Sequence, residues 1–280
     1  MEVLESGLYI VSTPIGNLDD ISLRAEKTLN IVDFIICENP IHSLKLLNKL
    51  GIKKKLYSLH DYNEENLIKR ISKYQSNSSI ALISDAGSPL ISDPGYNLVL
   101  DYINKNLKIT TIPGPSSIIS ALQLSGLPIN NFKFFGFIPK NKAAIDLKID
   151  EIEKLTTTSI FFISGNRINL FLDSLIIRNF NRNISVCKEI SKKNEKVFRG
   201  FAAKILTDLM LDSKNLKGEF VIIIGGKNKK ISRILDDKIE KQINKLLEKF
   251  TLTETVEIVH KLTKISKKEI YKKSLMLKNE

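Results

Sequence analysis

The sequence predicts an α/β fold in which strands and helices alternate. Three apolar runs, residues 8–11, 80–83 and 109–112, are each followed by a turn containing proline and glycine and then by apolar residues at helical spacing. Repeated strand–turn–helix units form a parallel sheet with right-handed crossovers. Because open α/β sheets bind ligands at the carboxyl edge of their strands, we expect the ligand site at these three turns.

The three turns differ from the familiar nucleotide-binding loops. They read T-P-I-G-N-L-D-D from Thr13, D-A-G-S-P-L-I-S-D-P-G from Asp85 and P-G-P-S-S from Pro113. Neither G-x-G-x-x-G nor G-x-x-x-x-G-K-[ST] follows a strand, and the G-x-S-x-G turn of serine hydrolases is absent from the sequence. The turns therefore suit another ligand, held largely by backbone groups, with Asp85 placed to balance a cation or to accept a hydrogen bond.

The other elements of the first half continue the alternation. We expect Asp93 to be the N-cap, and Pro94 the first residue, of a helix that runs to about residue 104. Pro115 opens another helix in the same way. The remaining expected helices cover residues 21–32 and 63–75, and the expected strands cover residues 8–12, 34–37, 79–84 and 108–112.

A second unit begins after the stretch G-F-I-P-K-N-K, which starts at Gly136. Its expected elements are a helix over residues 143–154 and strands over residues 159–163, 184–187, 196–200 and 219–224. The basic run 227–230 is typical of a linker. We therefore expect one α/β domain over residues 1–118, a second over 119–226, and a helical tail over 227–280.

The tail carries two capping boxes, Thr251 with Glu254 and Ser266 with Glu269, which mark helix starts. Two short helices joined by residues 263–266 resemble a helix-turn-helix element. Its lysines either contact RNA phosphates or form only a solvated basic face. The apolar face that would fold it consists of Val256, Val259, Leu262, Ile265 and Ile270.

Composition narrows the class of protein further. The net charge of +12 is uneven, because residues 1–114 carry −1, residues 115–226 carry +6 and residues 227–280 carry +7. This distribution favours a small ligand bound by the N-terminal part of the chain and a polyanion bound by the C-terminal part. AT-rich coding would also produce the 36 Lys against 7 Arg. Cys37 and Cys187 lack metal or disulfide spacing, and no run of about 20 apolar residues occurs. We expect a cytoplasmic enzyme without a metal.

Several long motifs, in order, resemble the tetrapyrrole-methylase superfamily and, within it, the ribosomal RNA small subunit methyltransferase I family. They are LYIVSTPIGNLDDISLR from Leu8, SDAGSPLISDPGYNLV from Ser84, IPGPSSIISALQLSGL from Ile112 and FGFIP from Phe135. Tetrapyrrole enzymes usually carry G-P-G-D after the first strand, so the T-P-I-G-N turn favours the RNA branch. The similarity covers about residues 7–225.

The resemblance implies two α/β domains with S-adenosylmethionine in the cleft between them, usually in a homodimer. It implies methyl transfer to the ribose 2′-hydroxyl of a cytidine in the decoding region of small-subunit (16S) ribosomal RNA, so that this RNA or the 30S subunit is the partner. Carried over by position, the residues around the cofactor would be Pro14, Gly16, Asp85, Gly87, Pro89, Ile91, Pro113, Gly114, Ser116, Phe162, Gly218 and Glu219.

The sequence also departs from the family pattern. Where relatives tend to read C-E-D-T-R-H-T, residues 37–43 read C-E-N-P-I-H-S, and where they read F-Y-E-S-P-H-R, residues 161–167 read F-F-I-S-G-N-R. The R-K that follows F-x-P becomes Lys140-Asn141. These changes leave the cofactor turns intact and fall on segments expected to face the substrate.

The chemistry needs an attack by a hydroxyl oxygen on a sulfonium methyl, to which positioning and a general base both contribute. Asp85 and Glu38 are the acids at strand ends, and Lys188-Glu189 offers another. We expect Asp85 to be the leading catalytic acid and Glu38 the second. Two alternatives stay open: a methyltransferase acting on a tetrapyrrole or similar small molecule, and a non-catalytic RNA-binding ribosome-assembly factor of the same fold.

Overall fold

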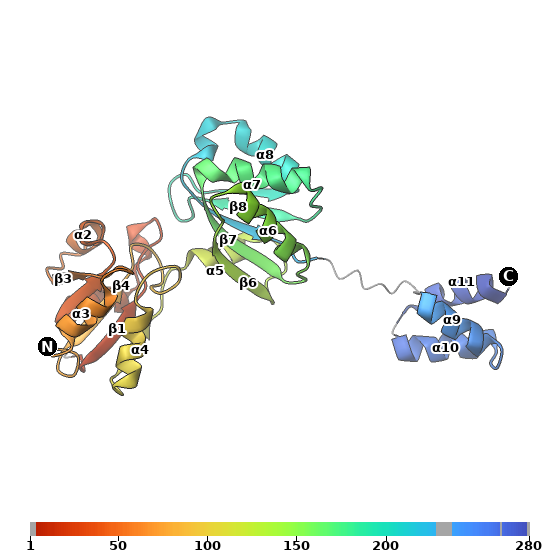
Figure 1. Ribbon diagram of the computed structural model, residues 1–280, viewed down its shortest axis with the longest axis horizontal. Coiled ribbons are helices and arrows are strands. Elements are labelled where there is room, and N and C mark those ends of the chain that lie inside the picture. Colours follow the sequence, from red (N-terminus) through yellow and green to blue (C-terminus); the bar gives the residue numbers. More distant parts are fainter. Residues whose placement is uncertain (1–3, 228–236, 264, 279–280) are drawn as a thin grey trace. The chain divides into compact units, whose positions relative to one another are not determined.

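The computed structural model describes residues 4–227, 237–263 and 265–278. By their contacts, residues 1–226 make one compact unit and residues 227–280 another. The first unit contains two five-stranded sheets, each with helices on both faces (Figure 1). The expected α/β fold is confirmed.

The first sheet is entirely parallel and has the order β3-β2-β4-β1-β5. The three strands that precede the proline and glycine turns, β4, β1 and β5, are therefore neighbours, and their turns meet at one edge. The strands are β1 (Gly7–Val11), β2 (Phe34–Cys37), β3 (Lys55–Ser58), β4 (Ser79–Ile83) and β5 (Ile109–Ile112).

Alternation of side chains along these strands gives the sheet two buried faces. Leu8 and Leu82 pack with α3 (Glu64–Ile71) and α4 (Tyr96–Asn104), whereas Tyr9 and Ile83 pack with α1 (Leu23–Ile31) and α2 (Pro40–Lys49). The turn after β1 contains a short 3₁₀ helix, η1 (Leu18–Asp20).

The second sheet is mixed and has the order β6-β7-β10-β8-β9, with only β6 and β7 parallel. One face packs on α6, α7 and α8, and the other on α5. The strands are β6 (Phe132–Phe137), β7 (Thr158–Ser164), β8 (Ile184–Lys188), β9 (Lys196–Gly200) and β10 (Glu219–Ile224). The helices are α5 (Ser117–Ser125), α6 (Lys142–Glu153), α7 (Gly165–Ile177), α8 (Ala202–Met210) and the 3₁₀ helix η2 (Ser213–Leu216).

Two of the expected helix starts are wrong. Helix α4 begins at Tyr96, after Gly95, so Asp93 does not cap it. One amide group of its first turn finds a partner on another helix, because the buried carboxylate of Glu64 accepts the N–H of Leu98 at 2.8 Å. Helix α5 has Ser116 as its N-cap, so Pro115 precedes the helix and does not open it.

The described residues of the second unit form the helices α9 (Asp237–Leu247), α10 (Leu252–Thr263) and α11 (Lys267–Lys278), which pack around Ile243, Val256, Val259, Ile265 and Ile270. The first capping box is reciprocal: the N–H of Glu254 donates to Thr251 Oγ1 at 3.4 Å, and the N–H of Thr251 donates to Glu254 at 2.9 Å. At the second, the N–H of Glu269 donates to Ser266 Oγ at 3.2 Å, and the Ser266 hydroxyl donates to Glu269 at 2.8 Å. Leu262 was expected in this core and is 78% exposed instead. Lys264 and residues 228–230 of the expected linker lie outside the described residues.

No helix in the described ranges is long and apolar enough to cross a membrane.

Candidate active site

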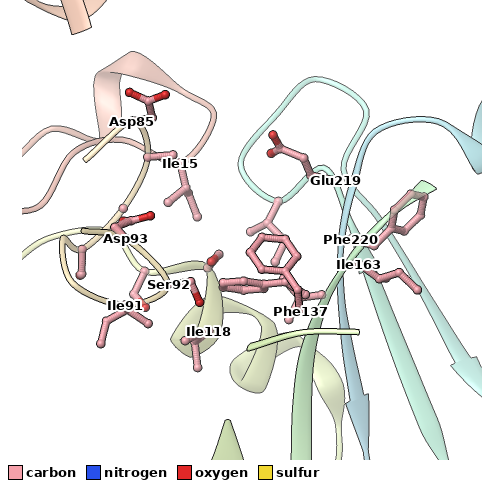
Figure 2. Close-up of a pocket in the computed structure, with 18 of the residues that line it drawn as sticks. Ile15, Asp85, Ile91, Ser92, Asp93, Ile118, Phe137, Ile163, Glu219 and Phe220 are labelled. Carbon is pink, nitrogen blue, oxygen red and sulfur yellow. The ribbon is translucent and has the colours of Figure 1, made fainter. Parts of the chain in front are cut away.

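A cavity of about 370 Å³ lies between the two sheets of the first unit (Figure 2). Loops that follow β1, β2 and β4, together with the start of α5, form one side, and β6, β7, β8 and β10 form the other. In Figure 2, Asp85, Asp93 and Ile91 come from the first group, and Phe137, Ile163 and Glu219 from the second. The cavity has the size of a small-molecule site.

Much of the cavity wall is apolar and aromatic. Phe162 packs against Phe137 with ring centroids 5.4 Å apart and against Phe134 at 4.9 Å, both with the rings steeply inclined. Ile15 and Ile118 line the cavity as well. Such a wall suits a planar or apolar ligand group.

Four carboxylates line the same cavity: those of Glu38, Asp85 and Asp93, and that of Glu219, which is paired with Lys192. Burial, with the nearby charges of Asp85 and Asp61, raises the pKa of Glu38, and His42 opposes this. Burial, with the charges of Glu38 and Asp85, raises the pKa of Asp93 to about 6, although a hydrogen bond with Ser84 opposes the rise. This concentration of negative charge favours a cationic ligand.

Asp93 is aimed into the cavity by the loop over residues 89–95. Leu90 and Ser92 both adopt the left-handed region, with φ of 75° and 69°. Leu90 folds beneath the loop against Gly95, where an added Cβ would lie 2.9 Å from Leu90 Cδ2. Ile91, Ser92 and Asp93 consequently all line the cavity, although three consecutive residues of an extended strand could not face one side.

The motif turns are joined to one another by hydrogen bonds. Thr13 and Gly87 exchange backbone hydrogen bonds of 2.9 and 3.0 Å, and the hydroxyl groups of Ser12 and Ser88 are 3.0 Å apart. The third turn is equally close, since a Cβ on Gly114 would lie 3.0 Å from Ser12 Cβ. The three turns therefore lie against one another at the carboxyl edge of the first sheet.

A second cavity, of about 260 Å³, adjoins the first and shares Ile15, Asp85, Ala86 and Glu219 with it. The turn after β1 and the first half of α2 form much of its lining, and Lys192 reaches it from the second sheet. Lys192 Nζ donates to Glu219 at 2.8 Å and to Glu189 at 3.1 Å. Asp85 thus lies on the wall between the two cavities.

The structure distributes the expected site residues over both cavities. Glu38, Asp85, Gly87, Ile91, Ser116, Phe162 and Glu219 line the first cavity, whereas Pro14 and Gly16 line the second together with Asp85 and Glu219. Pro89, Pro113, Gly114 and Gly218 line neither. Gly218 has φ of 106° and lets Glu189 approach, because a Cβ there would lie 2.6 Å from Glu189 Oε1.

Sequence reasoning missed Asp93, Phe137 and His42 as lining residues. Phe137 belongs to the F-G-F-I-P motif, so a signal for it existed. His42 lies on α2, a helix that was not predicted. Within the part of the chain that the structure describes, no group of three or more His, Cys, Asp or Glu side chains could hold a metal ion.

Comparison with known proteins defines the class. Residues 7–206 match the family described as Tetrapyrrole (Corrin/Porphyrin) Methylases, so the chain belongs to this class of methyltransferase. A cobalt precorrin-4 methyltransferase shares the fold at a TM-score of 0.57 and 14% identity, over 78% of this chain and 94% of that one. Diphthine synthase does so at 0.60 and 15%, over 78% and 89%.

Closer relatives identify the branch. A protein of Rickettsia prowazekii named ribosomal RNA small subunit methyltransferase I is 43% identical over 279 residues, covering 96% of each chain. A protein of the same name from Vibrio cholerae serotype O1 is 38% identical, covering 95% of this chain and 93% of the relative. The chain belongs to the ribosomal RNA small subunit methyltransferase I family.

Proposed function

We propose that the chain transfers a methyl group from S-adenosylmethionine to the ribose 2′-hydroxyl of a cytidine in the decoding region of 16S ribosomal RNA. The observation that carries the proposal is the first cavity, which combines an aromatic wall with four carboxylates, three of them without a lysine or arginine partner among the described residues. The names of the relatives supply the class of RNA.

The residues of the first cavity fit this cofactor. Phe137 and Phe162 offer apolar ring surfaces to an adenine, and Glu38, Asp85 and Asp93 offer negative charge to a sulfonium and an ammonium group. When bound, S-adenosylmethionine supplies an activated methyl group. The protein then has to bring a ribose oxygen into line with that methyl and exclude water, which positioned side chains accomplish by proximity.

The charge of the protein fits an RNA substrate. Residues 115–226 and 227–280 carry net charges of +6 and +7, whereas residues 1–114 carry −1. Basic surfaces of this kind contact phosphates and make the affinity depend on salt. We propose that the three-helix tail contributes to RNA binding, that the enzyme acts as a homodimer, and that its ribosomal substrate places the reaction in the cytoplasm.

The decisive experiment is methyl transfer from labelled S-adenosylmethionine to unmethylated small ribosomal subunits, followed by mapping of the modified nucleoside. A 2′-O-methylcytidine in the decoding region supports the proposal. Transfer to a tetrapyrrole alone favours the small-molecule alternative, and cofactor binding without any transfer favours an assembly factor.

Asp85→Asn and Asp85→Ala are expected to lose turnover or cofactor affinity. If both variants behave as the wild type, Asp85 has no functional role.

The contribution of the tail is tested separately by removing residues 230–280. RNA affinity should fall while cofactor affinity, measured by calorimetry, is retained. In the intact protein the logarithm of RNA affinity should fall with the logarithm of salt concentration by roughly 0.7 to 0.9 per phosphate contacted. A flat response to salt contradicts phosphate binding, and loss of cofactor affinity on truncation makes the tail structural.

A further inference from the structure

The second cavity, which adjoins the cavity assigned to the cofactor, has features of a nucleotide site. It shares a wall with the first cavity through Asp85, so a group held there lies next to the first cavity. Two basic side chains of α2, His42 and Lys45, line it three residues apart and therefore on the same face of the helix.

His42 and Asp85 form a preorganised pair. His42 Nδ1 lies 3.7 Å from Asp85 Oδ1, and both side chains are partly exposed, at 48% and 34%. Asn39 contacts both residues: its side chain caps α2 by accepting the backbone N–H of His42 at 3.3 Å, and its own backbone N–H donates to Asp85 Oδ1 at 3.2 Å. A carboxylate beside Nδ1 orients an imidazole and stabilises its protonated form, while Nε2 accepts the proton from substrate.

Lys45 differs from its basic neighbours in its pairing. Lys192 in the same cavity is paired with Glu189 and Glu219, and Lys49, one turn further along α2, is paired with Asp19 at 2.5 Å. Lys45 is exposed and makes no ion pair within the described residues. An exposed ammonium group at the margin of a nucleotide-sized cavity is suited to a phosphate.

We propose that the second cavity holds the target nucleotide, with His42 as the general base for its ribose hydroxyl and Lys45 as a contact to its phosphate. This inference rests on the proposed function. The hydroxyl proton passes to His42, the oxygen forms its new bond to the methyl carbon, and the electrons of the breaking C–S bond stay on sulfur. Asp85 stabilises the resulting imidazolium, which returns its proton to solvent.

The charged groups near His42 are Asp85 at the end of β4, Glu38 at the end of β2, Lys45 on the same helix and the positive N-terminal end of α2. A general base accepts a proton only in its unprotonated form, so the single-turnover rate of the wild type should fall on the acidic side.

The test compares His42→Asn, His42→Gln, Lys45→Gln and, as the matched control, Lys49→Gln. Both His42 variants should transfer methyl groups 10²- to 10⁴-fold more slowly in single turnovers, the range for a general base. They should lose the acidic limb of the pH profile, regain part of the rate with added imidazole, and bind S-adenosylmethionine within about threefold of the wild type.

Lys45→Gln should weaken RNA binding and lower the log–log salt slope by roughly one, with kcat retained. Lys49→Gln should behave as the wild type.

Results other than these overturn particular parts of the proposal. Wild-type rates in both His42 variants, or loss of cofactor binding together with turnover, overturn the assignment of the base. A Lys45→Gln variant with the RNA affinity of Lys49→Gln overturns the phosphate contact. A wild-type enzyme that methylates no small-subunit RNA contradicts the proposed function itself, and this inference with it.

Discussion

Replacing Asp93 by asparagine should stabilise the first unit at neutral pH. Burial, together with the charges of Glu38 and Asp85, raises the pKa of Asp93 from 3.8 to about 6. At about 1.4 kcal/mol per tenfold change in the ionisation constant, this corresponds to about 3 kcal/mol of destabilisation when Asp93 is ionised. Asp93 is only half-buried, so solvent screening reduces the expected gain for Asp93→Asn to about 1–2 kcal/mol.

The sign of the effect follows from the two ionisation states. Below pH 3.8 Asp93 is neutral in both the folded and the unfolded chain, so the wild type and Asp93→Asn should be equally stable. As the pH rises from 3.8 to about 6, the unfolded chain ionises first and the wild type loses stability relative to the variant. Above that interval the difference is constant.

Thermal unfolding at pH 4, 5, 6 and 7.5 measures this difference. For a unit of residues 1–226, 1–2 kcal/mol corresponds to a rise in Tm of roughly 3–6 °C at pH 7.5. Asp173→Asn, on the exposed side of α7, is the matched control and should leave Tm within about 1 °C. A Tm for Asp93→Asn at or below that of the wild type, or a difference that does not vary with pH, refutes the reasoning.

Three further outcomes are expected. The affinity for S-adenosylmethionine should fall about three- to tenfold between pH 7.5 and 5 as Asp93 becomes protonated. If calorimetry shows an unchanged affinity, the cationic groups of the cofactor do not lie near the carboxylates. Gly165→Ala should destabilise the first unit by about 2 kcal/mol, because the new Cβ would lie 2.1 Å from the Leu216 carbonyl oxygen. Chemical denaturation measures this loss, and a variant as stable as the wild type would show that the backbone there can shift. Thr251→Ala removes the Oγ1 atom that accepts the N–H of Glu254, whereas the backbone N–H of residue 251 can still donate to Glu254. The change should cost the tail about 1 kcal/mol, seen as faster amide exchange in α10, and unchanged exchange there would mean that the hydroxyl contributes nothing to the cap.

Much of the first cavity could be predicted because its residues follow strands directly. Asp85 and Glu38 come directly after β4 and β2, and the carboxyl ends of parallel strands lie at one edge of a sheet, so both acids were predicted at the same edge; that the two strands are neighbours comes from the structure. The position of Phe162 came from family resemblance, since no periodicity distinguishes it from the core residues of β7.

The parts that could not be predicted depend on backbone geometry and on distant contacts. Asp93 has the sequence signature of a helix cap, and only the left-handed conformations of Leu90 and Ser92 turn it into the cavity. His42 lies on a helix that begins N-P-I-H, and its pairing with Asp85 joins segments more than 40 residues apart. The mixed second sheet was missed because strand direction is not encoded in the apolar runs.

The strand order of the first sheet constrains when the site can form during synthesis. Strand β1 is made first, yet its partners are β4 and β5, and β4 separates it from β2. The apolar residues Leu8 and Val11 of β1, fully buried in the finished fold, have no strand to pair with until residues 79–112 have left the ribosome. A nascent chain of this protein therefore carries an unpaired apolar strand for most of the translation of its first sheet, a target for chaperones, and both cavities assemble late.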